Sequence, residues 1–125
     1  MSLQRRVLIV DDDADSADLL VQLLEMRGHD VRAVHSASHA VSEAAEFLPQ
    51  VAILDVGLPD MSGYELAQLL RKSERLAECK LIAVTGYSGD AVVHQGRLDS
   101  GVSLLQKPLT QAILASKIRD MLDRR

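Results

Sequence analysis

Polar residues that could take part in phosphoryl transfer follow three separate apolar runs of this sequence. They are Asp11 and Asp12 after the run at 7–10, Asp55 after the run at 51–54, and Thr85 after the run at 81–84. If these runs are neighbouring parallel strands, their carboxyl ends share one edge of a sheet, where open α/β folds build ligand sites. The sequence therefore predicts that these scattered residues form one pocket.

The acidic residues of this predicted pocket suit a hard divalent cation. Three carboxylates at one sheet edge repel one another, so a site made of Asp11, Asp12 and Asp55 is costly unless a cation binds there. Oxygen ligands without neighbouring His or Cys favour Mg²⁺ or Mn²⁺, and Mg²⁺ usually combines one or two carboxylates with water and a substrate phosphate oxygen. For Asp13 and Asp15 we expect only capping or solvated roles.

A carboxylate beside bound Mg²⁺ can attack phosphorus and form an aspartyl phosphate. The transferring group carries negative charge on its equatorial oxygens, so the site also needs a cationic side chain and hydrogen-bond donors. Lys107, after the apolar run at 102–105, could supply the charge, and Thr85 could supply a hydroxyl. The backbone amide of Gly86 could approach a phosphoryl oxygen closely because glycine has no side chain.

The elements that must position these residues alternate along the chain. Short apolar runs predict five strands, at 7–10, 31–34, 51–54, 81–84 and 102–105. Between the runs, apolar residues recur at helical spacing. We therefore predict an α/β fold of five βα units, doubly wound, with a parallel five-stranded sheet of order 2-1-3-4-5. The length suits a single domain over residues 1–125.

The first two predicted helices are bounded by capping and turn residues. Asp13 can cap the first helix and Gly28 can end it. The apolar stripe of this helix is predicted to consist of Leu19, Leu20, Leu23 and Leu24. The second helix is expected from about Ser38 to Phe47, stopping before Pro49.

The remaining helices are marked less evenly. Ser62 and Glu65 have the spacing of a capping box, so the third helix should begin there and continue through Leu70. The fourth crossover contains three glycines, which weaken a helix interior, so we expect only a short helix near 91–95. Thr110 can cap the last helix. Its inward face is predicted to consist of Ile113, Leu114, Ile118, Met121 and Leu122.

Composition limits the classes of function. The formal net charge of -4 gives no basic footprint, so neither direct nucleic-acid binding nor membrane contact is expected. Cys79 is the single cysteine and cannot form an internal disulfide, so we expect it to be a small core or edge residue. Because the sequence shows neither a long apolar run nor an export signal, a cytoplasmic setting is expected. The solvated surface is the expected place of His29, His35, His39 and His94.

Four motifs in this chain resemble those of the receiver domain of response regulators in two-component and phosphorelay signalling. They are Val10-Asp11-Asp12, the block Leu54-Asp55-Val56-Gly57-Leu58-Pro59-Asp60-Met61-Ser62-Gly63, Thr85-Gly86 and Lys107-Pro108. Each motif alone is common, and the resemblance depends on their joint order and spacing from Arg6 to about Leu122. It implies a flavodoxin-like fold and a signalling domain that catalyses only its own phosphorylation and dephosphorylation, not an enzyme.

The same resemblance implies a set of metal ligands. Asp12 and Asp55 would bind Mg²⁺, or Mn²⁺, directly, and Asp11 would act through water. The carbonyl oxygen of Gly57 would be a backbone ligand. These assignments come from the matching motif positions, not from the spacing of the acids.

The resemblance also implies how the phosphoryl group is held and where it comes from. Asp55 would accept it, Lys107 and Thr85 would bind its oxygens, and the amide of Gly86 would assist. The donor would be phosphohistidine on a histidine kinase or a histidine phosphotransfer protein. Many receivers have an aromatic residue three positions before the lysine, where this chain has Leu104, so a switch based on an aromatic ring is not expected.

The segments at 85–89 and 96–102 are most similar to receivers attached to hybrid histidine kinases. Because 125 residues leave no room for an output domain, the chain is expected to be either a free-standing receiver or a domain of a larger protein. A weak homodimer is left open.

Two other functions are weighed against this one. A small Mg²⁺-dependent phosphatase with an aspartate nucleophile would suit the cluster at 11–13, but such enzymes need a second acidic pair late in the chain, where this sequence has Lys107-Pro108. A flavin-binding protein of the flavodoxin type is opposed by the three carboxylates, which would repel the phosphate of FMN.

Overall fold

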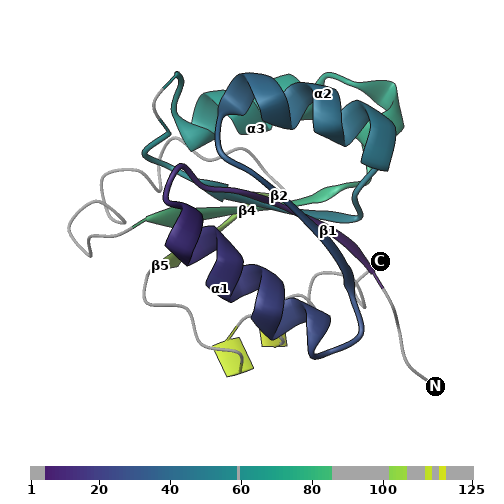
Figure 1. Ribbon diagram of the computed structural model, residues 1–125. Helices are drawn as coiled ribbons and strands as arrows, with labels where there is room; N and C mark the ends of the chain where they lie inside the picture. The colour runs from purple at the N-terminus through teal and green to yellow at the C-terminus, as the bar shows by residue number, and fades with distance from the viewer. Residues whose placement is uncertain (1–4, 59, 86–101, 107–111, 114–115, 118–125) are drawn as a thin grey trace.

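A parallel sheet with helices on both faces makes up the computed structural model, which describes residues 5–58, 60–85, 102–106, 112–113 and 116–117 (Figure 1). Its strands are β1 (Arg6–Val10), β2 (Asp30–Val34), β3 (Val51–Asp55), β4 (Lys80–Thr85) and β5 (Val102–Gln106). Their order is β2-β1-β3-β4-β5, and every pairing is parallel. The predicted α/β class and the parallel order 2-1-3-4 are confirmed, and β5 lies beside β4.

Between β1 and β4, the described residues form α-helices and one short 3₁₀ turn. They are α1 (Ala14–Glu25), α2 (Ala37–Phe47), α3 (Gly63–Arg71) and η1 (Glu74–Leu76). Helix α1 covers one face of the sheet, whereas α2 and α3 lie side by side on the other (Figure 1). The short helix expected near 91–95 and the Thr110 cap lie outside the described residues.

Helix α1 begins where the sequence predicts and turns a different stripe inward. The Asp13 carboxylate accepts the N–H of Asp15 at 3.1 Å, which confirms the cap. The buried residues of the helix are Ala17, Leu20 and Leu24. Leu19 is 54% exposed, so its place in the predicted stripe is wrong. Successive helical residues are about 100° apart, and the buried set at i, i+3 and i+7 leaves Leu19 on the outer side.

The loop after α1 shows why the helix ends there. Gly28 has a φ of +87°, in the region that side chains disfavour, and its N–H donates to the carbonyl oxygen of Glu25 at 2.9 Å. The next residue, His29, is half-buried, which corrects the expected solvated position. Its Nδ1 accepts the backbone N–H of Arg5 at 3.1 Å, so the ring joins the start of β2 to the chain before β1.

Helix α2 starts one residue earlier than predicted. Ser36 is its N-cap, and the Ser36 hydroxyl accepts the N–H of His39 at 3.3 Å, so the first helical residue is Ala37. The helix ends at Phe47, before Pro49 as predicted. In α3, Ser62 is the N-cap and accepts the N–H of Glu65 at 3.2 Å, which confirms the predicted start.

The inward face predicted for the last helix is wrong at the position that the structure describes. Ile113 is 44% exposed, and its neighbour Ala112 is exposed as well, whereas Lys117 is half-buried. The apolar pattern of the sequence therefore misplaces the inward direction at Ile113. The other apolar residues of that prediction lie outside the described residues.

Two apolar layers hold the sheet between its helices. Along β1, Val7 and Ile9 pack toward α1, whereas Leu8 and Val10 pack toward α2 and α3, as strand alternation requires. Cys79 is buried in the second of these layers, as expected, and desolvation raises the pKa of its thiol to about 12. Among the described residues, no helix is long and apolar enough to cross a membrane.

Candidate functional site

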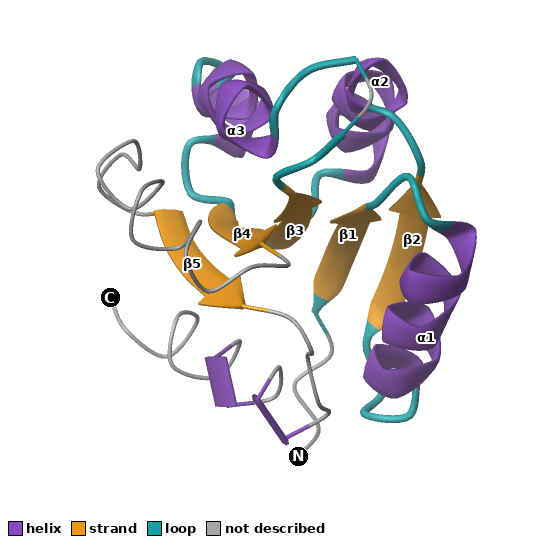
Figure 2. Cartoon of the chain, turned by 90° about the vertical axis from the view of Figure 1, so that its left-hand side faces the viewer, coloured by secondary structure: helices purple, strands orange, loops and turns teal. Residues whose placement is uncertain are grey.

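The ends of β1 and β3 bring the predicted acids to one edge of the sheet. Val10 is paired with Leu54 in the parallel register, so the residues that follow, Asp11 and Asp55, leave adjacent strands at the same level. The arrowheads of β1, β2 and β3 lie at this same edge in Figure 2. The prediction that these strand ends share one edge is therefore confirmed.

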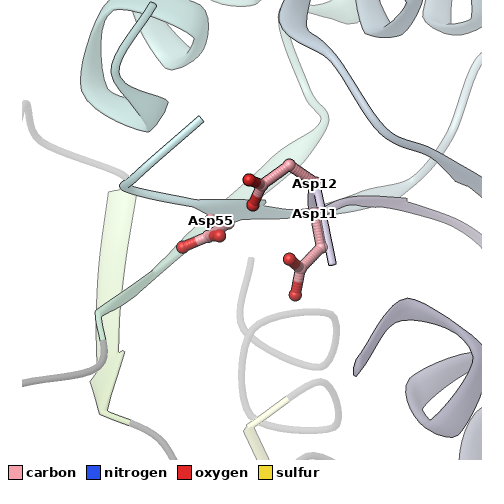
Figure 3. A group of neighbouring side chains, drawn as sticks. All are labelled: Asp11, Asp12 and Asp55. Atoms are coloured by element: carbon pink, nitrogen blue, oxygen red, sulfur yellow. The ribbon is translucent and has the colours of Figure 1, made fainter. Parts of the chain in front are cut away.

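Asp11, Asp12 and Asp55 form an acidic cluster at this edge. One carboxylate oxygen from each residue lies within 4.8 Å of the other two. Figure 3 shows Asp11 and Asp12 side by side after β1, with Asp55 beside them at the end of β3. Asp11 is buried, Asp55 is half-buried and Asp12 is exposed, so the cluster opens to solvent on one side.

The donor set of this cluster fits a hard divalent cation. Each of the three residues offers carboxylate oxygen, the ligand type that Mg²⁺ and Mn²⁺ prefer. A pocket beside the cluster is lined, apart from Asp11 and Asp55, by apolar side chains; these are Ile9, Val10, Leu20, Ile53 and Val84. Apolar walls lower the local dielectric and strengthen both the repulsion among the carboxylates and their attraction to a cation.

Asp11 is held by Val34, the last residue of β2, and by His35 after it, as well as by its own loop. Its N–H donates to the carbonyl oxygen of Val34 at 3.1 Å, and its Oδ1 accepts the N–H of Asp13 at 3.0 Å. The ring of His35 lies with Nδ1 2.9 Å from the carbonyl oxygen of Asp11. Because a carbonyl oxygen only accepts, the Nδ1 of His35 carries the proton. His35 is exposed, as expected, but its contact with the site was not predicted.

Backbone hydrogen bonds also hold the start of the loop after β3. The N–H of Val56 donates to the carbonyl oxygen of Val84 at 3.0 Å, and the N–H of Gly57 donates to Oδ1 of Asp55 at 3.3 Å. Gly57 is exposed, and a Cβ at this position would meet no atom within 4 Å. The residue predicted as a backbone ligand therefore lies directly beside the cluster, in open space.

The other predicted site residues are only partly described. Thr85 is the last residue of β4 and is paired with Gln106, the last residue of β5. Since Asp55 is paired with Val84, the backbone of Thr85 lies one residue beyond it at the same sheet edge. Gly86 and Lys107 lie outside the described residues.

Asp60 has a structural role that was not predicted from the sequence. Its Oδ1 accepts the N–H of Ala37 at 2.9 Å, and its Oδ2 accepts the N–H of Ser38 at 3.0 Å. These two bonds hold the pKa of the Asp60 carboxyl below its usual range. An acid in the loop before α3 is a type of residue that can accept hydrogen bonds at the start of a helix. Its partner α2 is far away in the sequence, so residue type alone does not identify the contact.

Comparison with protein families gives one match over most of the chain. The family model described as response regulator receiver domain matches residues 7–119. The DNA-binding dual master transcriptional regulator RpaA of Synechocystis sp. is 32% identical over 120 residues, which cover 95% of this chain and 49% of RpaA. The chain thus spans about half the length of this relative, and the same holds for the mycobacterial DNA-binding response regulators MtrA.

Solved structures with the same fold include receivers of two kinds. The response regulator receiver domain protein of Methanospirillum hungatei has a TM-score of 0.83 and 31% identity, covering 97% of this chain and 95% of that one. The signal receiver domain of a signal transduction histidine kinase from Syntrophus aciditrophicus has a TM-score of 0.84 and 28% identity, covering 95% of this chain and 90% of that one.

Proposed function

This chain belongs to the response regulator receiver domains, the signalling modules of two-component systems, and from that membership we propose that Asp55 is its phosphoacceptor. The observation that carries the proposal is the acidic cluster, in which Asp11, Asp12 and Asp55 each place an oxygen within 4.8 Å of the others. Such a cluster is consistent with a metal-assisted aspartyl phosphate site.

The metal ligands of the proposal are those of the matching motif. Asp12 and Asp55 would bind Mg²⁺, or Mn²⁺, directly, Asp11 would contribute through water, and Gly57 would contribute its carbonyl oxygen. When bound, the ion neutralises the three carboxylates and the developing charge on the phosphoryl oxygens. The position of Gly57 directly beside the cluster supports its part in this set.

The transfer reaction exchanges one bond for another. A carboxylate oxygen of Asp55 attacks the phosphorus of a phosphohistidine, an O–P bond forms, and the P–N bond to the imidazole breaks. The imidazole leaves with the electron pair of that bond and takes up a proton. Lys107, the Thr85 hydroxyl and the Gly86 amide hold the phosphoryl oxygens, and this part of the proposal is supported by the end of β4 at Thr85 and by the sequence motifs.

Acetyl phosphate with Mg²⁺ tests this function without a cognate kinase. We expect the intact protein to gain one phosphoryl group by mass spectrometry, the Asp55→Asn variant to gain none, and EDTA to prevent the gain. Asp18→Asn, which removes an exposed acid of α1, is the matched control and should be phosphorylated like the wild type. Failure of the wild type to gain phosphate would contradict the proposal, and multiple turnover with release of phosphate would favour the phosphatase instead.

The domain extent, the cellular location, the phosphoryl donor and the parent protein are proposed from the sequence motifs and from similarity to other proteins. We infer a single flavodoxin-like (βα)5 receiver domain over residues 1–125, in the cytoplasm, with a histidine kinase or phosphotransfer protein as donor. Attachment to a hybrid kinase is supported by the likeness to the Syntrophus receiver. A DNA-binding regulator is the second candidate, supported by the 32% identity to RpaA. The flanking sequence of the full reading frame separates the two.

A further inference from the structure

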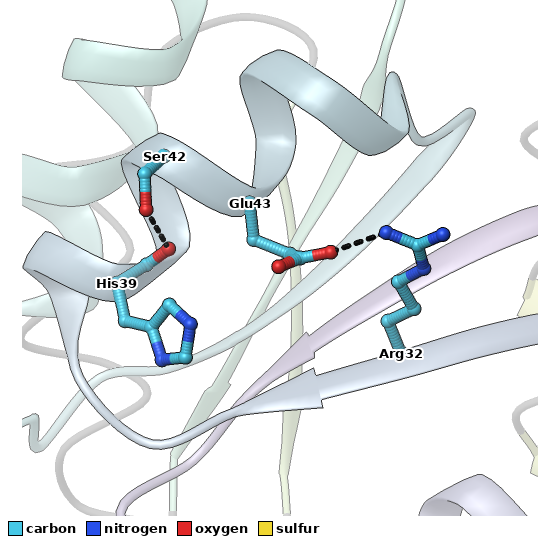
Figure 4. Close-up of polar contacts among 4 residues, drawn as sticks. All are labelled: Arg32, His39, Ser42 and Glu43. Carbon is cyan, nitrogen blue, oxygen red and sulfur yellow. Dashed lines mark hydrogen bonds and ion pairs between the residues drawn. The ribbon is translucent and has the colours of Figure 1, made fainter.

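Helix α2 is firmly seated on the sheet. Its inward side chains are almost fully buried; they are Ala37, Ala40, Ala44 and Phe47. Arg32 of β2 forms an ion pair with Glu43 of α2, which Figure 4 shows, and its guanidinium lies 4.4 Å from the ring centroid of Phe47. Because α2 is packed in this way, its first turn can position a neighbouring loop that is hydrogen-bonded to it.

Asp60 joins the loop between β3 and α3 to the first turn of α2 by hydrogen bonds. Its two carboxylate oxygens accept the N–H groups of Ala37 and Ser38, which belong to the first turn of α2. These N–H groups have no partner within their own helix, so a carboxylate from another segment can satisfy both. Leu58 and Met61, on either side, pack into the apolar layer beneath α2 and α3.

The residues just before α2 also contact the loop after β1, which carries Asp11 and Asp12. Val34 and His35, directly before α2, are hydrogen-bonded to the backbone of Asp11. Residues 34–38, which we call the β2–α2 connection, thus contact both the loop after β1 and the loop after β3. In the part of the chain that the structure describes, the side chain of Asp60 accepts its hydrogen bonds to the second loop.

We propose that Asp60 is a positioning residue of the metal site, holding the loop after Asp55 at a fixed distance from Asp11 and Asp12. The inference rests on the proposed function. The three carboxylates repel one another, and a loop without this attachment can move away from the cluster when no cation is bound. Binding would then have to reassemble the site, which lowers the affinity for the ion.

A Mg²⁺ titration followed by NMR amide shifts, with no phosphoryl donor present, tests this role. In Asp60→Ala the Mg²⁺ concentration at half-saturation should rise up to about tenfold, less than the roughly 10- to 100-fold loss that follows removal of a group bonded directly to a metal ligand. The amides of Ala37 and Ser38 should exchange hydrogen faster in this variant. Asp18→Ala removes an equally charged, exposed side chain and should bind Mg²⁺ like the wild type.

Two further measurements separate positioning from charge and from general damage. In about 0.5 M KCl long-range charge effects are strongly screened, and the weakening should persist if a local attachment is its cause. The maximal rate of phosphorylation by acetyl phosphate should stay near that of the wild type, while the Mg²⁺ concentration required for it rises.

Specific outcomes would overturn the inference. Equal Mg²⁺ affinity in Asp60→Ala and wild type, or a weakening that disappears in high salt, removes the positioning role and leaves the proposed function intact. A wild type that binds no Mg²⁺ would remove the proposed function as well.

Discussion

Gly63 lies directly against the backbone of Asp55. Its N–H donates to the carbonyl oxygen of Val56 at 3.0 Å, and a Cβ at position 63 would lie 2.5 Å from the carbonyl oxygen of Asp55. This close approach requires glycine, because real Cβ atoms essentially never come so near another heavy atom. Helix α3 therefore begins in contact with the strand end that carries the proposed phosphoacceptor.

Gly63→Ala should destabilise the protein by about 1 to 3 kcal/mol, because the added methyl group must push backbone atoms apart. Urea unfolding measures this change. Gly57→Ala is the matched control, since a Cβ there meets nothing within 4 Å, and it should change stability by less than about 0.5 kcal/mol. Equal stability of the two variants would contradict the close contact.

Asp12→Asn should stabilise the metal-free protein and reduce its response to Mg²⁺. Removing one charge from the cluster relieves repulsion of roughly 1 kcal/mol at this separation in water-like surroundings. Mg²⁺ raises stability only as far as it binds the folded state, so losing a ligand should diminish that rise. Thermal unfolding in EDTA and in Mg²⁺ gives both quantities, and an undiminished rise in Asp12→Asn would argue against its role as a ligand.

Leu20→Ala and Leu19→Ala should differ although the residues are neighbours in α1. Leu20 is 7% exposed, so its truncation should cost about 2 to 4 kcal/mol through lost burial and a cavity. Leu19 is 54% exposed, and its truncation should change the free energy of unfolding by less than about 0.5 kcal/mol. Urea unfolding measures both changes. Similar losses of unfolding free energy in the two variants would show that α1 presents a different side to the sheet.

Stability should fall as the pH drops because of His29. Burial first, then the nearby charges of Arg5 and Arg27, lower the pKa of this residue in the folded protein. The neutral ring is therefore favoured by folding, and its contribution is complete above the ordinary pKa of about 6.5 and decreases as the pH falls toward the lowered value. Urea unfolding between about pH 7.5 and 5 should show a smaller loss in His29→Gln, and identical slopes would disprove the assignment.

Local sequence signals predicted much of the architecture correctly. Four strand positions and their order, the cap at Asp13, the turn at Gly28 and the start of α3 at Ser62 all follow from apolar runs and capping chemistry within a few residues of each other. Helix α2 starts one residue before the predicted Ser38, because the hydroxyl of Ser36 accepts the N–H of His39 and makes Ser36 the cap. Residue types alone do not reveal this hydrogen bond.

The acidic cluster itself was also predictable, because parallel strands of known order place Asp11, Asp12 and Asp55 at one edge whatever the loops do. The tertiary structure alone decided which side of α1 faces the sheet, that His35 holds the carbonyl of Asp11, and that Asp60 reaches the first turn of α2. Residue type and periodicity carry information about a residue and its near neighbours in the sequence. Contacts between loops more than twenty residues apart depend on how the packed elements bring them together, and no local pattern encodes that distance.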